Sequence, residues 1–523
     1  MCNIVKAHEV KKVLAITILI LYNAQLKIRF TVRYMHIGKI VIAQTAGQAA
    51  SFSLWSLAIS GGTYFFFSEE KFNREENKME NKTDAIYDAK SLGTGKMLIL
   101  GLQHMFAMFG ATVLVPIITG LSVSATLLFA GIATLFMHLV TGRKVPVFLG
   151  SSFAFLGGYA AVKAAGVAAG YTEAVSLTYA CVGIACAGLL YLVLALICKI
   201  FGSKNVMKYF PPVVTGPIII AIGMNLAPSA INNCETNWWI ALVAIVVVIV
   251  CNIWGKGMIK IIPILIGVLA SYLVAAITGN VDFSGVKEAA WIGLPFKMEN
   301  TVFGLFASGN VDSGLLISAI ITIVPIAFAT MMEHVGDISA IGGTVGKNFI
   351  EDPGLHRTLI GDGVGTTIAA LFGAPANTTY GENTGVLALT KVYDPAVIRI
   401  AAYFAIVLSF CPKFAALITA MPSATIGGVS LILYGMISAI GIRNMVENHT
   451  DFQQSRNVII AALIIGLAIG ISYSDAGAIN LGSVSLSGLA VASIVGIVLN
   501  AVLPGRRKEY APNEENSSSL GVY

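Results

Sequence analysis

Long apolar runs follow one another along most of the chain, and short polar connections separate them. A helix that crosses a membrane needs about 20 mostly apolar residues. From Lys96 onward about fourteen runs approach that length, so the pattern predicts an all-α polytopic membrane protein. We place them at 97–119, 123–142, 147–166, 175–201, 211–231, 238–254, 260–278, 313–334, 358–374, 378–392, 394–412, 423–441, 456–473 and 484–503.

Two of these runs, 147–166 and 378–392, are interrupted by glycine and polar residues. Each is the third run in a block of seven, and an odd number of spans makes the second block enter the membrane in the opposite direction. The pattern therefore predicts two inverted repeats, with the substrate site where the interrupted runs meet. Irregular backbone at membrane depth must line a cavity or be buried in protein.

The flanks of the two blocks set the predicted domain boundaries. Residues 1–90 do not fit the regular pattern, and we hypothesise that translation starts at Met79, because Arg74-Glu75-Glu76 can be encoded as a ribosome-binding sequence. The remaining divisions are a first repeat over 91–278, an outer connecting loop over 279–312, a second repeat over 313–503 and a cytoplasmic tail over 504–523.

Composition excludes a soluble enzyme. The chain is 56% hydrophobic and 11% charged, whereas soluble domains carry about 25% charged residues. The net charge of +6 needs no nucleic acid partner, because Lys and Arg collect in cytoplasmic loops. Alternate loops carry these residues, from Arg143 and Lys144 to the tail Arg506, Arg507 and Lys508, which predicts a multi-pass protein of the cell membrane with both termini in the cytoplasm. The seven cysteines show no metal or disulfide spacing, so we expect no metal and no cofactor.

Acidic residues in or beside apolar runs are the first candidates for function, because charges inside a membrane are costly. Glu333 and Asp337 lie four residues apart near the end of the eighth run, so they share one helix face. Two carboxylates that close cannot both ionise easily, so the pair can hold a proton. Glu382 is the second acidic position and lies beside Gly381 in the tenth run.

Polar and aromatic residues complete the predicted cavity. The stretch Gly150–Phe155 supplies hydroxyls, backbone amides and aromatic faces, and Phe153 fits either a stacking role or the core. For Gln103-His104 in the first run we favour a supporting, hydrogen-bonding role. Acceptors, donors and aromatic faces together suit a small, planar, neutral ring, and the scarcity of cationic side chains in the runs disfavours an anionic substrate.

At these residues the sequence resembles the nucleobase–ascorbate transporter family, also called nucleobase:cation symporter-2. The family signature matches from Glu382-Asn383-Thr384-Gly385 to Thr390, and Glu at its first position resembles the uracil branch. The resemblance extends from about Leu92 to Leu503. Further matching motifs are Gln103-His104, Gly150–Phe155, Glu333–Gly336, Asp352–Arg357 and Asn377–Asn383.

The resemblance implies a core domain of spans 1–4 and 8–11, a gate domain of spans 5–7 and 12–14, and a short strand in spans 3 and 10. It implies uracil:H⁺ symport by movement of the core against the gate, in a membrane protein able to dimerise through its gate domain. Glu333 and Glu382 would accept the ring N–H groups, and Asn383 and Thr390 would support the site. The backbone amides of Phe153 and Gly381 would reach the carbonyls, and Ser152, Tyr380 and Tyr434 would line the pocket.

The proton site departs from the family pattern. Uracil permeases with a histidine four residues after the core glutamate use it for coupling, whereas this chain has Asp337. We therefore expect the pair of Glu333 and Asp337 to carry the proton.

Three alternatives stay open at this point. A xanthine or urate permease of the same family is disfavoured by Glu382 in place of Gln. An anion transporter or channel of related architecture is disfavoured by the missing cationic pocket. A membrane enzyme lacks a nucleophile–base set or metal cluster in the sequence.

Overall fold

The computed structural model describes residues 85–475, 477–481 and 484–504, and of Glu382 it describes the backbone alone. The hypothesised start at Met79 and nearly all of the atypical 1–90 segment lie outside the described residues. So does the predicted tail beyond residue 504.

Helices of the first half begin at residues that favour a helix start. Ser122 Oγ accepts a hydrogen bond from the amide of Ala125 and Asn237 Oδ1 from that of Trp239, while Pro212 and Pro263 occupy first turns. The elements are η1 (Ala89–Leu92), α3 (Thr94–Thr119), α4 (Val123–Val140), β1 (Leu149–Ser151), α5 (Leu156–Ala168), α6 (Glu173–Phe201), α7 (Ser203–Met207), α8 (Pro212–Glu235), α9 (Trp238–Trp254), α10 (Met258–Ile261) and α11 (Pro263–Ile277).

The second half has the same order of long helices with a strand between them. Its elements are α14 (Ser313–Ile323), η3 (Val324–Ile326), α15 (Ala327–Val345), η4 (Ile350–Gly354), α16 (Leu355–Leu371), β2 (Asn377–Thr379), α17 (Glu382–Thr390), α18 (Pro395–Ser409), α19 (Pro412–Thr419), α20 (Ser423–Glu447), α21 (Ser455–Ser472) and α22 (Gly488–Val502).

Several helix boundaries differ from the predicted runs, and two of the differences are large. The apolar run predicted to end at residue 334 continues as helix to Val345, so Glu333 lies inside α15 and not at its end. Glycines and Asp337 lower the hydropathy of its last turns without breaking them. The run 394–412 bends by 89° between α18 and α19, where Pro412 begins a new helix.

Further short elements lie between the long helices of the described chain. The loop between the halves contains α12 (Ser284–Glu288), η2 (Met298–Asn300) and α13 (Val302–Ala307). Between α21 and α22, β3 (Ala478–Leu481) pairs antiparallel with β4 (Val484–Ser487).

By length and composition, seven helices in the described part of the chain are apolar enough to span a membrane, or eight if the bent α18–α19 pair counts as one span. Three further apolar helices, α9, α11 and α22, are shorter. The structure is therefore that of a multi-pass helical membrane protein, and the count of fourteen stays a prediction.

The strands β1 and β2 lie within the two interrupted runs and pair antiparallel with each other. Leu149 is opposite Thr379 and Ser151 is opposite Asn377. The pairing continues at both ends, because the amide of Ser152 donates to Ala376 O (2.8 Å) and that of Tyr380 to Phe148 O (3.0 Å). Where the two apolar runs are not helical, the backbone N–H and C=O groups of each strand thus bond to the other strand.

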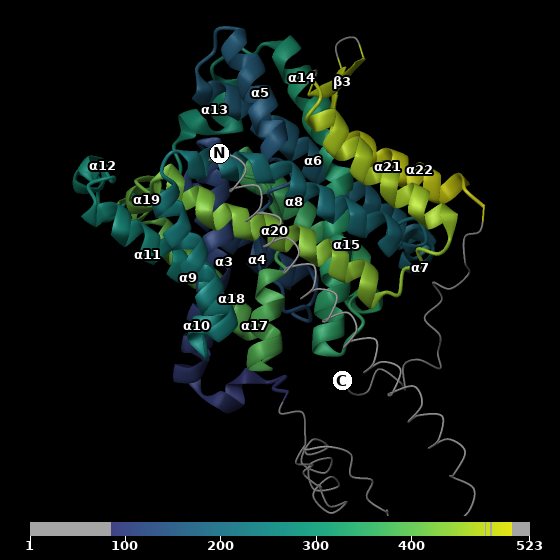
Figure 1. Ribbon diagram of the computed structural model, residues 1–523, viewed down its shortest axis with the longest axis horizontal. Helices are drawn as coiled ribbons and strands as arrows, with labels where there is room; N and C mark the ends of the chain where they lie inside the picture. Colours follow the sequence, from purple (N-terminus) through teal and green to yellow (C-terminus); the bar gives the residue numbers. More distant parts are fainter. Residues whose placement is uncertain (1–84, 476, 482–483, 505–523) are drawn as a thin grey trace, which may run out of the picture. The chain divides into compact units, whose positions relative to one another are not determined.

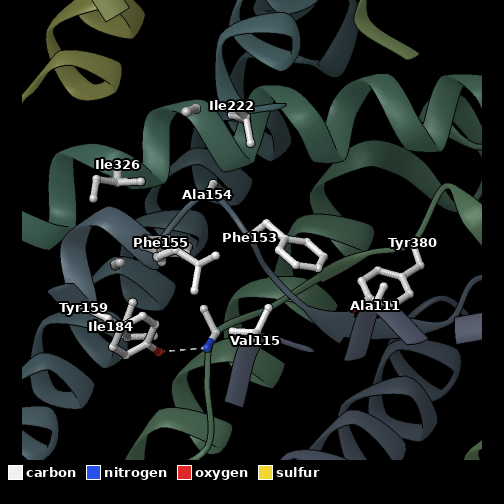
Figure 2. Packing of buried hydrophobic residues seen from close by; sticks show 14 of the residues in the cluster. Ala111, Val115, Phe153, Ala154, Phe155, Tyr159, Ile184, Ile222, Ile326 and Tyr380 are labelled. Carbon is white, nitrogen blue, oxygen red and sulfur yellow. Dashed lines mark hydrogen bonds between the residues drawn. The ribbon is translucent and has the colours of Figure 1, made fainter. Parts of the chain in front are cut away.

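Helices from the two halves pack against each other around this pair. Helix α20 runs along α8, α16 packs on α4 and α6, and α18 packs on α3 and α4. Helices α21 and α22 lie side by side and also contact α8 (Figure 1). One large buried apolar cluster surrounds the strand pair and includes Phe153 and Tyr380 (Figure 2).

Candidate functional site

A small cavity of about 30 Å³ lies beside the ends of β1 and β2 and is partly open. Elements of both halves line it: the chain after each strand, α15, α8 and α20. The lining residues are Phe153, Ile219, Glu333, Asp337, Thr378, Thr379, Tyr380, Gly381, Ile437 and Ile440.

Two carboxylates from α15 face this cavity. Glu333 and Asp337 are one helical turn apart, as the spacing predicted. Asp337 is 7% exposed and lies against Gly381, where a methyl group on the glycine would be 3.4 Å from Asp337 Oδ1. The arrangement concentrates acidic groups next to the backbone that follows β2.

Two aromatic rings, those of Phe153 and Tyr380, line the cavity, and both belong to the apolar cluster in Figure 2. The Tyr380 hydroxyl donates to Ser151 O (3.0 Å) and accepts from Thr112 Oγ1 (3.3 Å), so Tyr380 is fixed to β1 and α3. Phe153 contacts Tyr434 of α20 edge to face, with ring centroids 5.6 Å apart. Its ring therefore has a neighbour on one side and the cavity on another.

Close approach of β1 depends on Gly150. A Cβ at this position would overlap the Tyr380 ring and lie 2.7 Å from Thr112 Oγ1. Glycine is required here for its lack of a side chain.

The apolar wall of the cavity, which we name the isoleucine wall, consists of Ile219 from α8 and Ile437 and Ile440 from α20. Sequence analysis missed these three, since an isoleucine in an apolar run carries no signal of function. Thr378 and Thr379 were also missed, although they belong to the matched stretch Asn377–Asn383.

Two predicted pocket residues, Ser152 and Tyr434, are buried behind the lining. Tyr434 contacts Phe153, which lines the cavity. The Ser152 amide extends the strand pairing, and its hydroxyl has no hydrogen-bond partner among the described residues. The side chain of Glu382 lies outside the described residues, while its backbone begins α17 directly after Gly381.

The predicted supporting residues divide into two groups. Asn383 Nδ2 donates to His104 Nδ1 (3.2 Å) and to His104 O (3.3 Å), so it joins α17 to α3. Gln103 is buried on α3. The Thr390 hydroxyl bonds to Val386 O within α17 (2.8 Å), away from the cavity.

A buried polar cluster behind the cavity contains a residue that sequence analysis did not select. Asp362 of α16 is fully buried, and its Oδ2 lies 2.8 Å from His334 Nδ1. His334 also contacts Thr379 Oγ1 (2.9 Å) and Thr358 Oγ1 (3.0 Å). Because Thr358 donates to Leu355 O, His334 Nε2 is the donor to Thr358. An ionisable residue in the apolar run 358–374 was a readable signal.

The cluster explains why His334 does not line the cavity. It points from α15 toward α16 and holds the end of β2 through Thr379. No group of three or more His, Cys, Asp or Glu residues suited to a metal exists in the described part of the chain.

Acidic groups facing a small cavity inside a bundle of apolar helices define a membrane transporter. A family model described as "Permease family" matches residues 95–477, and the chain belongs to this family. The membership predicted from the motifs is thereby confirmed, and the chain is a multi-pass membrane transporter and not an enzyme.

The alignments with curated relatives cover nearly the whole length of those relatives. The chain is 40% identical to the "Uracil permease" of Bacillus caldolyticus, covering 81% of this chain and 96% of the relative. It is 37% identical to the "Uracil permease" of Escherichia coli K12, covering 77% and 90%. It is 36% identical to the "Putative pyrimidine permease RutG" of Escherichia coli K12, covering 80% and 91%.

Solved structures share the fold at low sequence identity. The transmembrane domain of the cyanobacterial bicarbonate transporter BicA is 17% identical, with a TM-score of 0.52 over 79% of this chain and 98% of that one. The murine Solute Carrier 26 family member A9 anion transporter in the inward-facing state is 10% identical, with a TM-score of 0.52 over 86% and 76%. At such identities the likeness concerns the fold alone.

Proposed function

We propose that the chain carries uracil across the cell membrane together with protons. The observation that carries this proposal is the cavity lined by Glu333, Asp337 and the backbone after β2. Relatives named uracil permeases, matched over 90% or more of their length, support uracil as the solute.

Uracil has two ring N–H groups and two carbonyls in one plane, so it needs acceptors and donors side by side. In our proposal Glu333 and Glu382 accept the N–H groups, and the backbone amides of Phe153 and Gly381 donate to the carbonyls. Phe153 and the isoleucines of α8 and α20 contact the apolar faces. Tyr380 holds the lining in place, and Ser152 and Tyr434 pack behind it.

The proton in this proposal is held by Glu333 and Asp337. Both face one cavity from one helix, so a proton on either relieves repulsion between them. An N–H group of bound uracil donates a hydrogen bond to one of the two carboxylates. Solute binding is thereby coupled to the position of the proton.

Movement of a core against a gate is the proposed transport step, with two inverted repeats of seven spans. Support comes from helix–helix contacts between the halves: each has a counterpart in which the equivalent helices of the opposite halves meet. Contacts of α6 with α16 correspond to those of α18 with α4, and contacts of α8 with α21 correspond to those of α20 with α9. The carboxylates then belong to the core and the isoleucine wall to the gate, through which two copies could associate.

The deciding experiment is uptake of labelled uracil by cells that lack their own transporter. Uptake above background that a proton uncoupler abolishes is the expected result, and uptake unaffected by the uncoupler would contradict symport. Excess xanthine as competitor tests the purine alternative, and we expect it to leave uracil uptake unchanged.

Asp337→Asn tests the proton site. We expect it to abolish uncoupler-sensitive accumulation above equilibrium while exchange of uracil across the membrane persists, because Asn keeps the shape of the side chain and loses its charge. Intact proton-driven accumulation in this variant would refute the role of Asp337.

A further inference from the structure

The short segment ahead of α3 is bound to the second half of the chain. Ile86 forms a parallel bridge with Val392: its amide donates to Lys391 O and its carbonyl accepts from the amide of Tyr393, both at 2.8 Å. The segment is therefore fixed by backbone hydrogen bonds to the connection between α17 and α18.

Asp394 strengthens this attachment with one carboxylate. Its Oδ2 accepts from the amide of Ala89 and its Oδ1 from that of Ala396 at the start of α18, both at 2.8 Å. Ala89 is fully buried in an apolar cluster with Val392 and Val397.

Tyr87 connects the same segment to the end of α15. Its hydroxyl donates to Val345 O (2.8 Å), which is the last residue of that helix. Lys347 Nζ lies 4.7 Å from the centre of the Tyr87 ring, and the Tyr393 ring lies 5.5 Å from it. The ring is thus held between α15 and the α17–α18 connection.

These contacts join the two elements that carry the acidic residues of the proposed site. Helix α15 bears Glu333 and Asp337, and α17 begins at Glu382. The two helices contact each other directly, and residues 86–89 bridge the ends of both that lie away from the strands.

We propose that residues 86–89, which we name the clasp, position α15 relative to α17 and so set the geometry of the substrate site. The proposal rests on the proposed function, since the site in question is the uracil site. Ile86, Tyr87 and Asp394 are positioning residues: none of them lines the cavity, and they act on it through the helices they join.

Ile86→Pro is the strongest test, because proline removes the amide that donates to Lys391 O. Ala85→Pro is its matched control, since the amide of Ala85 takes no part in the pairing. Tyr87→Ala removes both the hydroxyl and the ring contacts, and Tyr87→Phe removes the hydroxyl alone. Ile86→Pro and Tyr87→Ala should raise the KM for uracil about fivefold or more, the change expected from losing about one hydrogen bond from the bound state. Vmax per transporter in the membrane should stay within about twofold of the wild-type value. The KM of Tyr87→Phe should lie between those of the wild type and Tyr87→Ala, and the KM of Ala85→Pro should match the wild type.

A distance measurement separates the clasp from the uracil proposal. Spin labels at Thr344 on α15 and Leu389 on α17, in a chain without its native cysteines, report the separation of the two helix ends. We expect one narrow distance distribution in the wild type and a broader one in Ile86→Pro and Tyr87→Ala.

An unchanged distribution would overturn the clasp. A broader distribution with an unchanged KM would also overturn it, because the segment would then have only a structural role. If the wild type takes up no uracil, the proposed function fails, while the distance distributions still support or refute the joining of α15 to α17. If Ile86→Pro does not reach the membrane, the two Tyr87 variants decide.

Discussion

The strands β1 and β2 are equal in length and hydrogen-bonded to each other, yet they supply different chemistry. Within the described stretch 149–155 Phe153 alone lines the cavity, whereas the stretch 377–381 supplies Thr378, Thr379, Tyr380 and Gly381. Helices α3 and α15 differ as well. Helix α3 carries Gln103-His104 and α15 carries Glu333-His334, so an amide precedes the histidine in one half and an acid precedes it in the other.

The two histidines follow this difference. His104 accepts a hydrogen bond from Asn383, while His334 holds Asp362 and two threonines. In our proposal the carboxylates that bind uracil and the proton come from the second half, whereas the first half contributes Phe153 to the lining. The strands can pair although their neighbouring side chains differ in charge, because the pairing uses only main-chain atoms.

The largest expected effect concerns the acid–amide difference. Glu333→Gln should reduce uracil uptake about 10- to 140-fold, because a hydrogen bond to a charged acceptor contributes ~1.5–3 kcal/mol. Gln103→Leu, the matched change on α3, should reduce uptake far less. Initial uptake rates at equal amounts of protein in the membrane measure both, and equal losses would contradict the division of roles.

A second effect concerns the framework itself. Gly150→Ala should destabilise the protein by ~1–3 kcal/mol, because the added methyl overlaps Tyr380. Gly157→Ala is the control, since nothing lies within 4 Å of a Cβ built there. Thermal unfolding of the detergent-solubilised variants measures the difference, and an unchanged midpoint for Gly150→Ala would show that Tyr380 can move away freely.

A smaller effect separates neighbouring threonines of β2. Thr379→Val should destabilise by ~1 kcal/mol, because its hydroxyl bonds to His334. Thr378→Val should be nearly neutral, since the Thr378 hydroxyl has no hydrogen-bond partner among the described residues. The same thermal assay compares the two variants. A larger loss of stability in Thr378→Val than in Thr379→Val would contradict the role of the Thr379–His334 hydrogen bond in holding β2.

The smallest expected effect tests the N-terminal boundary. A chain that begins at Met79 should transport uracil like the full sequence, because it retains the clasp and everything after it. Uptake rates and the mass of the purified protein check this. A large loss of uptake would assign a function to the residues before Met79.

Hydropathy predicted the positions of the two interrupted runs, and the structure has a strand and a helix in each. The i, i+4 spacing, and not hydropathy, predicted that Glu333 and Asp337 share one helix face, and both line the cavity. Hydropathy failed where polarity and helix formation disagree: α15 continues past Asp337, and its two acidic residues and His334 face the cavity and α16. The isoleucine wall could not be predicted from the sequence, because isoleucine is common in any membrane-spanning run and so does not mark a site.

The strand pairing has a consequence for how the protein is made. Ser151 and Tyr380 are bonded although 229 residues separate them in the chain. At a synthesis rate of roughly 5–20 residues per second, the second partner emerges about 11 to 46 s after the first. During that interval the open backbone of residues 149–151 has no strand to pair with. The insertion machinery or water at the membrane surface must satisfy it until β2 arrives.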